Sequence, residues 1–242
     1  MNSMSSTLIF AHRGANREAP ENTRAAFDQA LEYAIDGMET DVQLSRDEVA
    51  VLWHDRFLNK LGLADKHIDD FDYAQLHKLN FAEATLMSLQ DFVQSYRSRC
   101  RLLLEIKNRE WEPNSRHQLK VRLTLDEAGT IQDESIMASS FNLASLVYAH
   151  QYRPQFPLIY NLEEEQSWTE AQQVLADHSF LRGLCLPIEN LDINMVQLLR
   201  EHGKVLAVYT CNSDEEITKA LDLAVDILIS DVPQRALHMR DA

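Results

Sequence analysis

The stretch GMETDVQL at residues 37–44 contains the pattern that decides the fold. It is rich in β-forming residues, and it is followed through the short turn SRDE by a second such run, VAVLWHD at residues 49–55, as in a hairpin. Similar runs recur along the whole chain. They occupy residues 7–13, 101–107, 135–141, 157–162, 183–188, 204–211 and 226–231.

Amphipathic stretches with helical spacing separate most of these runs, as at residues 21–35, 88–99, 114–129, 191–203 and 213–224. Ser213 and Glu216 form a capping signature at the start of the last stretch. Strands that are apolar on both faces and alternate with helices indicate a parallel sheet covered on both sides. Eight βα units account for all runs but residues 49–55, which predicts an α/β fold of the TIM (β/α)₈ barrel type. A doubly wound open sheet is the alternative.

The chain of 242 residues is 45% hydrophobic and 25% charged, and no Ser-, Gly- or Pro-rich linker interrupts it. This composition predicts a single domain over residues 1–242. Residues 56–87 are the least regular part, with a polar turn at 62–70 and a short helix near 71–79. They predict a small insertion after the second-strand hairpin, at the end of the barrel where it can shape access to a site.

The formal net charge of −15 disfavours nucleic acid and anionic membranes as partners, because both require an excess of Lys and Arg. Three separated cysteines without a C-x-x-C pattern fit a reducing compartment. The N-terminal residues do not have the pattern of a signal peptide, and no apolar run approaches the roughly 20 residues of a spanning helix. We therefore expect a cytoplasmic protein without membrane insertion; its oligomeric state is left open.

Acidic side chains at strand ends predict a metal site. Glu39 and Asp41 are two residues apart in one strand, so both carboxylates point to the same face about 7 Å apart along the backbone. An E-x-D pair alone is more often an exposed edge, but Glu105 lies in the apolar run LLLEIKN, which is unsuited to an exposed strand. Ionised carboxylates that converge in this way require a cation, and hard ions such as Mg²⁺ or Ca²⁺ prefer oxygen ligands.

Two histidines and two cations lie beside these acids in the sequence pattern. His12 and His54 each end a strand, and imidazole can take or give a proton near neutral pH. Either alone is more often structural, and zinc ligation lacks a supporting H-E-x-x-H or cysteine set. Arg13 and Lys107 place positive charge next to the same groups, either to balance the acids or to bind an anion. The combination suits displacement at phosphorus.

Other strand ends are weaker candidates. Tyr209 either lines the mouth of the barrel or belongs to the core, and Asp231 and Asn212 each have the position of a helix cap. The acidic run at residues 163–165 has the pattern of a solvated helix start.

The chain carries a series of short motifs whose identity and order resemble the glycerophosphodiester phosphodiesterase family, of the bacterial cytoplasmic type, over almost the whole length. The motifs that carry the resemblance are His12-Arg13-Gly14, Pro20-Glu21-Asn22-Thr23, Ala26-Phe27, residues 37–42, His54-Asp55, Glu105-Ile106-Lys107, Ser140-Phe141, residues 208–212 and residues 229–233.

The resemblance implies a TIM-like barrel in which Glu39, Asp41 and Glu105 bind Mg²⁺ or Ca²⁺. It also implies that His12 and His54 are the catalytic pair. The implied reaction cleaves a small-molecule glycerophosphodiester to sn-glycerol 3-phosphate and an alcohol, with Arg13, Lys107 and Tyr209 as substrate contacts. We assign His12 as the base and His54 as the acid, although the sequence does not decide their order. The nucleophile is either water or a hydroxyl of the substrate.

The sequence departs from the family pattern at several positions. Glu48 replaces the usual glycine of the hairpin turn, Tyr209 replaces a tryptophan, and Met87-Ser88 replaces Pro-Thr. Ala224 and Ile227 replace glycines near the last strand. These changes affect the pocket wall and loops rather than the predicted ligands. A lysophospholipase D-type phosphodiesterase is the nearer alternative, and a non-catalytic binding module is the more distant one.

Overall fold

The computed structural model describes residues 7–79, 85–108, 112–129 and 135–242. Within them, the strands are β1 (Leu8–His12), β2 (Gly37–Leu44), β3 (Ala50–Leu52), β4 (Arg101–Ile106), β5 (Ile136–Ser140), β6 (Leu158–Asn161), β7 (Gly183–Pro187), β8 (Val205–Tyr209) and β9 (Ile227–Ser230). The α-helices are α1 (Arg24–Leu31), α2 (Tyr73–Leu76), α3 (Leu89–Tyr96), α4 (Asn114–Ala128), α5 (Leu143–Tyr152), α6 (Trp168–Asp177), α7 (Ile193–Glu201), α8 (Asp214–Asp222) and α9 (Pro233–Asp241).

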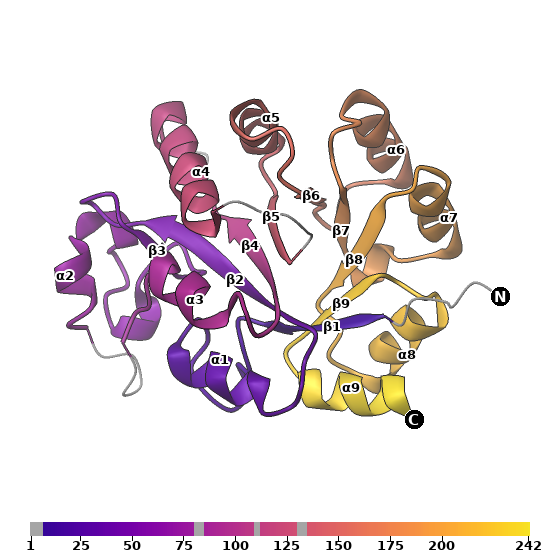
Figure 1. Cartoon of the computed structure of the whole chain (residues 1–242), viewed down its shortest axis with the longest axis horizontal. Coiled ribbons are helices and arrows are strands. Elements are labelled where there is room, and N and C mark those ends of the chain that lie inside the picture. The colour runs from indigo at the N-terminus through magenta and orange to yellow at the C-terminus, as the bar shows by residue number, and fades with distance from the viewer. Residues whose placement is uncertain (1–6, 80–84, 109–111, 130–134) are drawn as a thin grey trace.

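The parallel strands close into a barrel. β1 pairs in parallel with β2 on one side and with β9 on the other, while β4 to β9 follow one another around the sheet. β3 lies outside the ring and pairs antiparallel with β2, so the predicted hairpin is confirmed. Figure 1 shows the helices arranged around the central strands. The TIM-barrel prediction is therefore confirmed. In a doubly wound open sheet a gap would separate two of these strands, whereas here β1 pairs with both β2 and β9 and closes the ring.

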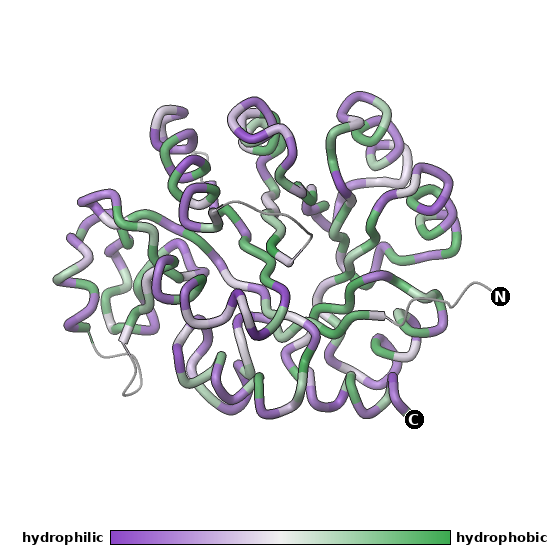
Figure 2. The backbone as a smooth tube through the Cα atoms, in the orientation of Figure 1, coloured by the Kyte–Doolittle hydropathy of each residue, from purple (hydrophilic) through white to green (hydrophobic). Residues whose placement is uncertain are grey.

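Apolar side chains fill two separate regions of the barrel. The larger lies between the strands and the surrounding helices. The second lies inside the barrel and contains Phe10, Leu103, Met137, Ile159, Cys185, Ala207, Ile227 and Ile229. Figure 2 shows hydrophobic residues frequent along the strands, whereas the surrounding helices carry both hydrophilic and hydrophobic residues. Because the side chains of the second region fill the inside of the barrel, a site is expected at the carboxyl-terminal end of the strands.

The part of the predicted insertion that the structure describes contains α2 and two 3₁₀ helices, η1 (Asn59–Leu61) and η2 (Ile68–Asp70). It packs on the hairpin through a third apolar cluster that includes Val51, Leu58 and Leu76. Residues 80–84 of the predicted range lie outside the described residues. The single-domain organisation and the limits of the insertion stay predictions.

Helix starts follow the capping signatures of the sequence. Ser213 accepts a hydrogen bond from the Glu216 amide, and the Glu216 side chain accepts from the Ser213 amide, as predicted for α8. Across the described part of the chain, no helix combines the length and the apolar character needed to cross a membrane.

Glu48 adopts a backbone conformation that favours glycine, with φ of 66° in the hairpin turn. A left-handed conformation costs a non-glycine residue about 1–2 kcal/mol, whereas glycine loses about 0.5–1 kcal/mol of additional conformational entropy on folding. We therefore expect Glu48→Gly to raise the free energy of unfolding by about 0.5 kcal/mol. Urea denaturation checks this, with Glu48→Ala as the control that keeps the strain; an equal gain in both variants would contradict the backbone explanation.

Candidate active site

Three carboxylates converge at the carboxyl-terminal end of the barrel. Asp41 on β2 lies in register with Glu105 on β4, and Glu39 is two residues earlier on the same face. The ligand atoms of the three side chains all lie within 4.8 Å of one another. Both oxygens of Glu39 and Oδ1 of Asp41 are buried without a hydrogen-bond partner in the described structure. Buried carboxylate oxygens that lack donors are the ligands that a hard divalent cation satisfies, so these residues fit such an ion.

The protonation of the cluster reflects its crowding. Burial raises the pKa of Glu39 well above its usual value, and the neighbouring charges of Asp41 and Glu105 raise it further. Burial also acts to raise the pKa of Asp41, but Arg13 and Lys107 outweigh it and hold that pKa below its usual range. The crowding of three carboxylates thus disfavours the ionised form of Glu39, and a bound cation would favour it.

Two basic side chains contact the acids directly. Arg13 places Nε 3.0 Å from Asp41 Oδ2, while Lys107 Nζ lies 2.8 Å from Glu105 Oε1 and 3.5 Å from Asp41 Oδ1. Burial opposes their charge, but the neighbouring carboxylates hold the pKa of both groups above the usual value. Part of their charge therefore balances the acids, as one of the two sequence-based interpretations expected. Gly14 permits this arrangement, because a Cβ there would lie 2.6 Å from the backbone of Ala26.

His12, at the end of β1, is oriented by an aspartate far away in the sequence. Its Nδ1 lies 2.6 Å from Asp231 Oδ1, and its Nε2 lies 3.9 Å from Glu39 Oε2. Because a carboxylate only accepts hydrogen bonds, the Nδ1 proton points to Asp231, and Nε2 faces the metal-site carboxylates. Asn212 holds both the side chain and the backbone of Asp231. Its Nδ2 donates to Asp231 Oδ2, and its Oδ1 accepts from the Asp231 backbone amide, both at 2.9 Å.

The cap interpretation of Asp231 and Asn212 is wrong. The residue preceding α9 is Val232, without a side-chain cap, and α8 is capped by Ser213. Both side chains instead support His12.

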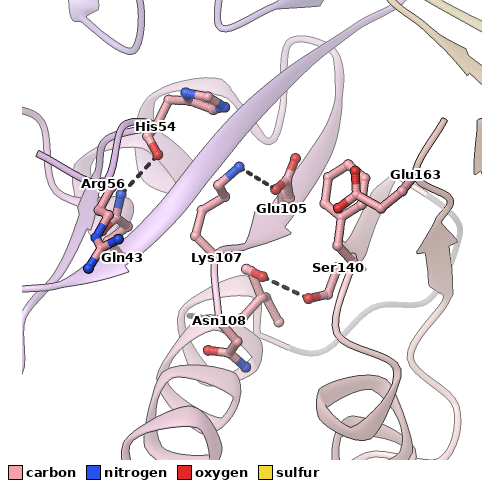
Figure 3. A pocket seen from close by; sticks show the side chains of 10 residues that line it. Gln43, His54, Arg56, Glu105, Lys107, Asn108, Ser140 and Glu163 are labelled. Atoms are coloured by element: carbon pink, nitrogen blue, oxygen red, sulfur yellow. Dashed lines mark hydrogen bonds and ion pairs between the residues drawn. The ribbon is translucent and has the colours of Figure 1, made fainter. Parts of the chain in front are cut away.

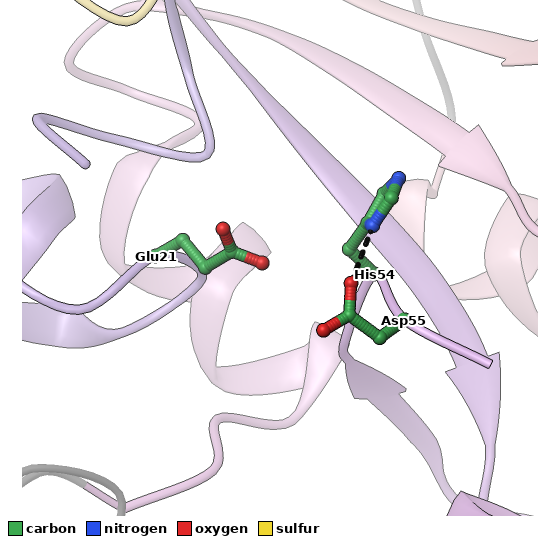
Figure 4. Close-up of side chains that lie close together, drawn as sticks. All are labelled: Glu21, His54 and Asp55. Carbon is green, nitrogen blue, oxygen red and sulfur yellow. Dashed lines mark hydrogen bonds and ion pairs between the residues drawn. The ribbon is translucent and has the colours of Figure 1, made fainter. Parts of the chain in front are cut away.

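His54, which follows β3, has a partner beside it in the sequence. Its Nδ1 lies 2.8 Å from Asp55 Oδ1, so its Nε2 is also the nitrogen that remains available. Lys60, on the insertion, contacts both Asp55 Oδ2 at 2.9 Å and Glu21 Oε1 at 2.8 Å. Glu21, His54 and Asp55 form a second group with metal-ligand spacing, shown in Figure 4. There the ammonium of Lys60 already supplies the positive charge.

Asp55 contributes to stability in a pH-dependent way. Hydrogen bonding from His54, with a further contribution from Lys60, lowers its pKa from 3.8 to about 2 despite partial burial. A lowered carboxyl pKa stabilises the fold above the unfolded value, and this stabilisation is lost as the pH falls through the folded value. Since the group is partly exposed, we expect Asp55→Asn to cost about 1 kcal/mol near neutral pH.

Urea denaturation at about pH 6 and about pH 3 tests this expectation. The difference in the free energy of unfolding between Asp55→Asn and wild type should be smaller at the lower pH. Asp222→Asn, on the exposed end of α8, is the control. A difference that is constant or widens on acidification would contradict the assigned cause.

Two connected cavities open at this end of the barrel. The inner one, of about 160 Å³, is lined by His12 and Glu39 together with buried side chains such as Leu103 and Cys185. The outer one, of about 440 Å³, reaches the exposed residues Arg56 and Glu163. Figure 3 shows the outer cavity. The residues common to both cavities are His54, Glu105, Lys107 and Phe141.

Tyr209 lies in the wall of the inner cavity, but its hydroxyl donates to the carbonyl of Leu162 at 2.6 Å. Its ring packs edge-on against Phe141, with centroids 5.9 Å apart. Tyr209 therefore lines the inner cavity, but its hydroxyl proton is hydrogen-bonded within the protein.

The acidic run at residues 163–165 does not start a helix. α6 begins at Trp168 behind a cap by Ser167, and Glu163 borders the outer cavity. Other lining residues were not singled out from the sequence, namely Gln43, Ser139, Phe141 and Asn161. Of these, only Phe141 belonged to a recognised motif.

Comparisons with known proteins agree with this geometry. Residues 12–235 match the model of the glycerophosphoryl diester phosphodiesterase family. A glycerophosphodiester phosphodiesterase of Bacillus altitudinis is 28% identical over 250 aligned positions, which cover 97% of this chain and 98% of that protein.

Two solved structures share the fold. A phosphodiesterase from Oleispira antarctica, in complex with the product sn-glycerol-3-phosphate, has a TM-score of 0.86 and 24% identity, with 98% of both chains covered. A glycerophosphodiester phosphodiesterase from Thermotoga maritima has a TM-score of 0.81 and 23% identity, with 96% of this chain and 98% of that chain covered. The match covers nearly all of the barrel and includes the three carboxylates and both histidines of the site, so the chain belongs to the glycerophosphoryl diester phosphodiesterase family.

Proposed function

We propose that the protein hydrolyses glycerophosphodiesters to sn-glycerol 3-phosphate and an alcohol, with a divalent metal bound by Glu39, Asp41 and Glu105. The observation that carries this proposal is a cluster of three carboxylates, three of whose buried oxygens lack a hydrogen-bond partner in the described structure, beside two histidines whose Nδ1 atoms are both held by aspartates. Family membership identifies the substrate class.

The charges of the site suit an anionic substrate only when a cation is present. Three carboxylates face two basic side chains, Arg13 and Lys107, so the side chains alone carry an excess of negative charge. A bound Mg²⁺ or Ca²⁺ would reverse this sign and supply positive charge to the phosphoryl oxygens. Lys107 also lies where the two cavities meet, which is where a phosphate with two substituents would sit. Arg13 and Lys107 are therefore the proposed phosphate contacts.

The two histidines provide the proton transfers. Each has Nδ1 held by a carboxylate, which fixes the orientation of the ring and leaves Nε2 as the nitrogen that can exchange a proton with the substrate. His12 borders only the inner cavity, whereas His54 borders both. An alcohol of variable size requires the open path to the surface, so His54 Nε2 would protonate that leaving group. His12 Nε2 would then accept the proton of the attacking hydroxyl.

The same geometry bears on the alternatives. The rim of the outer cavity carries polar and charged side chains, including Gln43, Arg56, Asn108 and Glu163, which can hydrogen-bond a polar head group. This favours water-soluble glycerophosphodiesters over lysophospholipids. A non-catalytic module has no need for two oriented histidines beside a cluster of three carboxylates.

An assay with purified protein tests the proposal. Glycerophosphocholine, glycerophosphoethanolamine and glycerophosphoglycerol are supplied with Mg²⁺ or Ca²⁺, and sn-glycerol 3-phosphate is measured with a coupled dehydrogenase. We expect release that stops when the metal is chelated, and little turnover of lysophosphatidylcholine. His12→Ala protein purified in the same way excludes a contaminating enzyme. No release from any of the three substrates with either metal would remove the assignment.

A further inference from the structure

Two buried polar side chains in the inner cavity lack adequate partners. Ser139 on β5 is 1% exposed and Asn161 at the end of β6 is 4% exposed. Their one hydrogen bond in the described structure is a long contact to each other, from Asn161 Nδ2 to Ser139 Oγ at 3.4 Å. Asn161 Oδ1 has no partner there. Buried polar groups are normally hydrogen-bonded, because an unsatisfied one destabilises the fold, so this pair requires an explanation.

The backbone holds Asn161 firmly in place. The next residue, Leu162, donates its amide to Cys185 O on β7 at 2.8 Å. Its carbonyl accepts the Tyr209 hydroxyl from β8 at 2.6 Å. The end of β6 is thus tied to both following strands of the barrel. The backbone position from which the Asn161 side chain enters the cavity wall is therefore set by the barrel.

The position of the pair relates it to the reaction. Both side chains border the same cavity as His12, Glu39 and Lys107. In the register of the sheet, Ser139 lies directly beside Glu105. Nearby, the cavity wall is apolar, formed by Leu103, Cys185 and Ile229. The polar pair therefore lines the same small cavity as the proposed phosphate contact Lys107.

We propose that Ser139 and Asn161 bind the free hydroxyl groups of the glycerol moiety in the inner cavity. The pair offers a hydroxyl proton, an amide donor and an amide oxygen, and adjacent alcohol groups both donate and accept. This inference rests on the proposed function and deepens it, because it makes unsubstituted glycerol the recognised part of the substrate. A site that hydrogen-bonds a hydroxyl rejects analogues that lack it, since its own buried groups are then left unpaired.

The test compares two ligands that cannot react further. Binding of sn-glycerol 3-phosphate and of n-propyl phosphate, which lacks both hydroxyls, is measured by calorimetry in the presence of Mg²⁺. A neutral hydrogen bond contributes up to about 1.5 kcal/mol, so we expect wild type to prefer glycerol phosphate by about tenfold or more. Asn161→Leu, of similar shape, should reduce this preference to about twofold and leave propyl phosphate affinity unchanged. Ser139→Ala should have an intermediate preference.

A control variant and a stability measurement separate ligand binding from structural support. Asn108→Leu removes another asparagine with an unpartnered Oδ1, but one on the outer cavity, and should keep the wild-type preference. Without ligand, Asn161→Leu should unfold at the same temperature as wild type or a higher one, because it removes an unsatisfied buried amide.

Loss of affinity for both ligands in equal proportion, or an unchanged preference in Asn161→Leu, would overturn the inference alone. Wild-type protein that binds neither ligand would overturn the proposed function together with the inference.

Discussion

Replacing His12 with alanine is expected to lower kcat by about 10²- to 10⁴-fold, the usual contribution of a positioned acid or base. The ring is 18% exposed, so it is accessible to substrate, and His12 does not belong to the group of ligand atoms that Glu39, Asp41 and Glu105 form. Metal affinity should therefore change little. Steady-state kinetics on glycerophosphocholine and Mg²⁺ titration by calorimetry measure the two effects separately.

His238→Ala, on α9 outside both cavities, is the matched control and should retain wild-type kcat. Asp231→Asn should reproduce part of the His12→Ala defect, because Asp231 holds the catalytic tautomer. Wild-type turnover in His12→Ala would exclude the histidine from catalysis, and a parallel loss of metal binding would make it a ligand instead.

Replacing Glu39 with glutamine is expected to have opposite effects on stability with and without metal. In the metal-free protein, burial and then the charges of Asp41 and Glu105 raise the pKa of Glu39 above 4.5. A carboxyl group with a raised folded pKa loses stability as the pH rises from its unfolded value to its folded value. Glutamine cannot ionise, so metal-free Glu39→Gln should become increasingly more stable than wild type as the pH rises above 4.5.

Saturating Mg²⁺ should reverse the order of stabilities. A ligand present at about 100 times its Kd stabilises the folded state by about 2.7 kcal/mol, and only wild type retains the full ligand set. Thermal unfolding of both proteins with EDTA and with Mg²⁺ measures the stability difference without metal and with it. Glu32→Gln, outside the cluster at the end of α1, should show neither effect. An equal Mg²⁺-induced rise in Tm for wild type and Glu39→Gln would show that Glu39 does not bind the ion.

The sequence contains most of what determines the fold and the centre of the site. Strands are local features, so His12, Glu39 and Glu105 were identifiable from the runs in which they lie. The count of runs predicted closure, which the pairing of β1 with β9 confirms. Helix α5 was less visible, because LASLVYAHQY has no clear polar face. The start of α6 was misplaced because three acidic residues precede its true cap, Ser167.

Partnerships between side chains were largely hidden, because they depend on how distant segments meet. Asp231 lies 219 residues from His12, and nothing in residues 229–233 distinguishes a partner of histidine from a helix cap. Lys60 reaches Glu21 and Asp55 from an irregular insertion. Asp55 is the exception, since it directly follows His54 and was within reach of sequence reasoning.

The most direct test of the divalent-metal site is a crystal structure of the protein grown with Ca²⁺, with anomalous scattering used to locate the ion. The account predicts one peak among the oxygens of Glu39, Asp41 and Glu105, at about 2.3–2.6 Å from its ligands. A peak only at the second group, beside Glu21 and Asp55, or no peak at the end of the barrel, would contradict it.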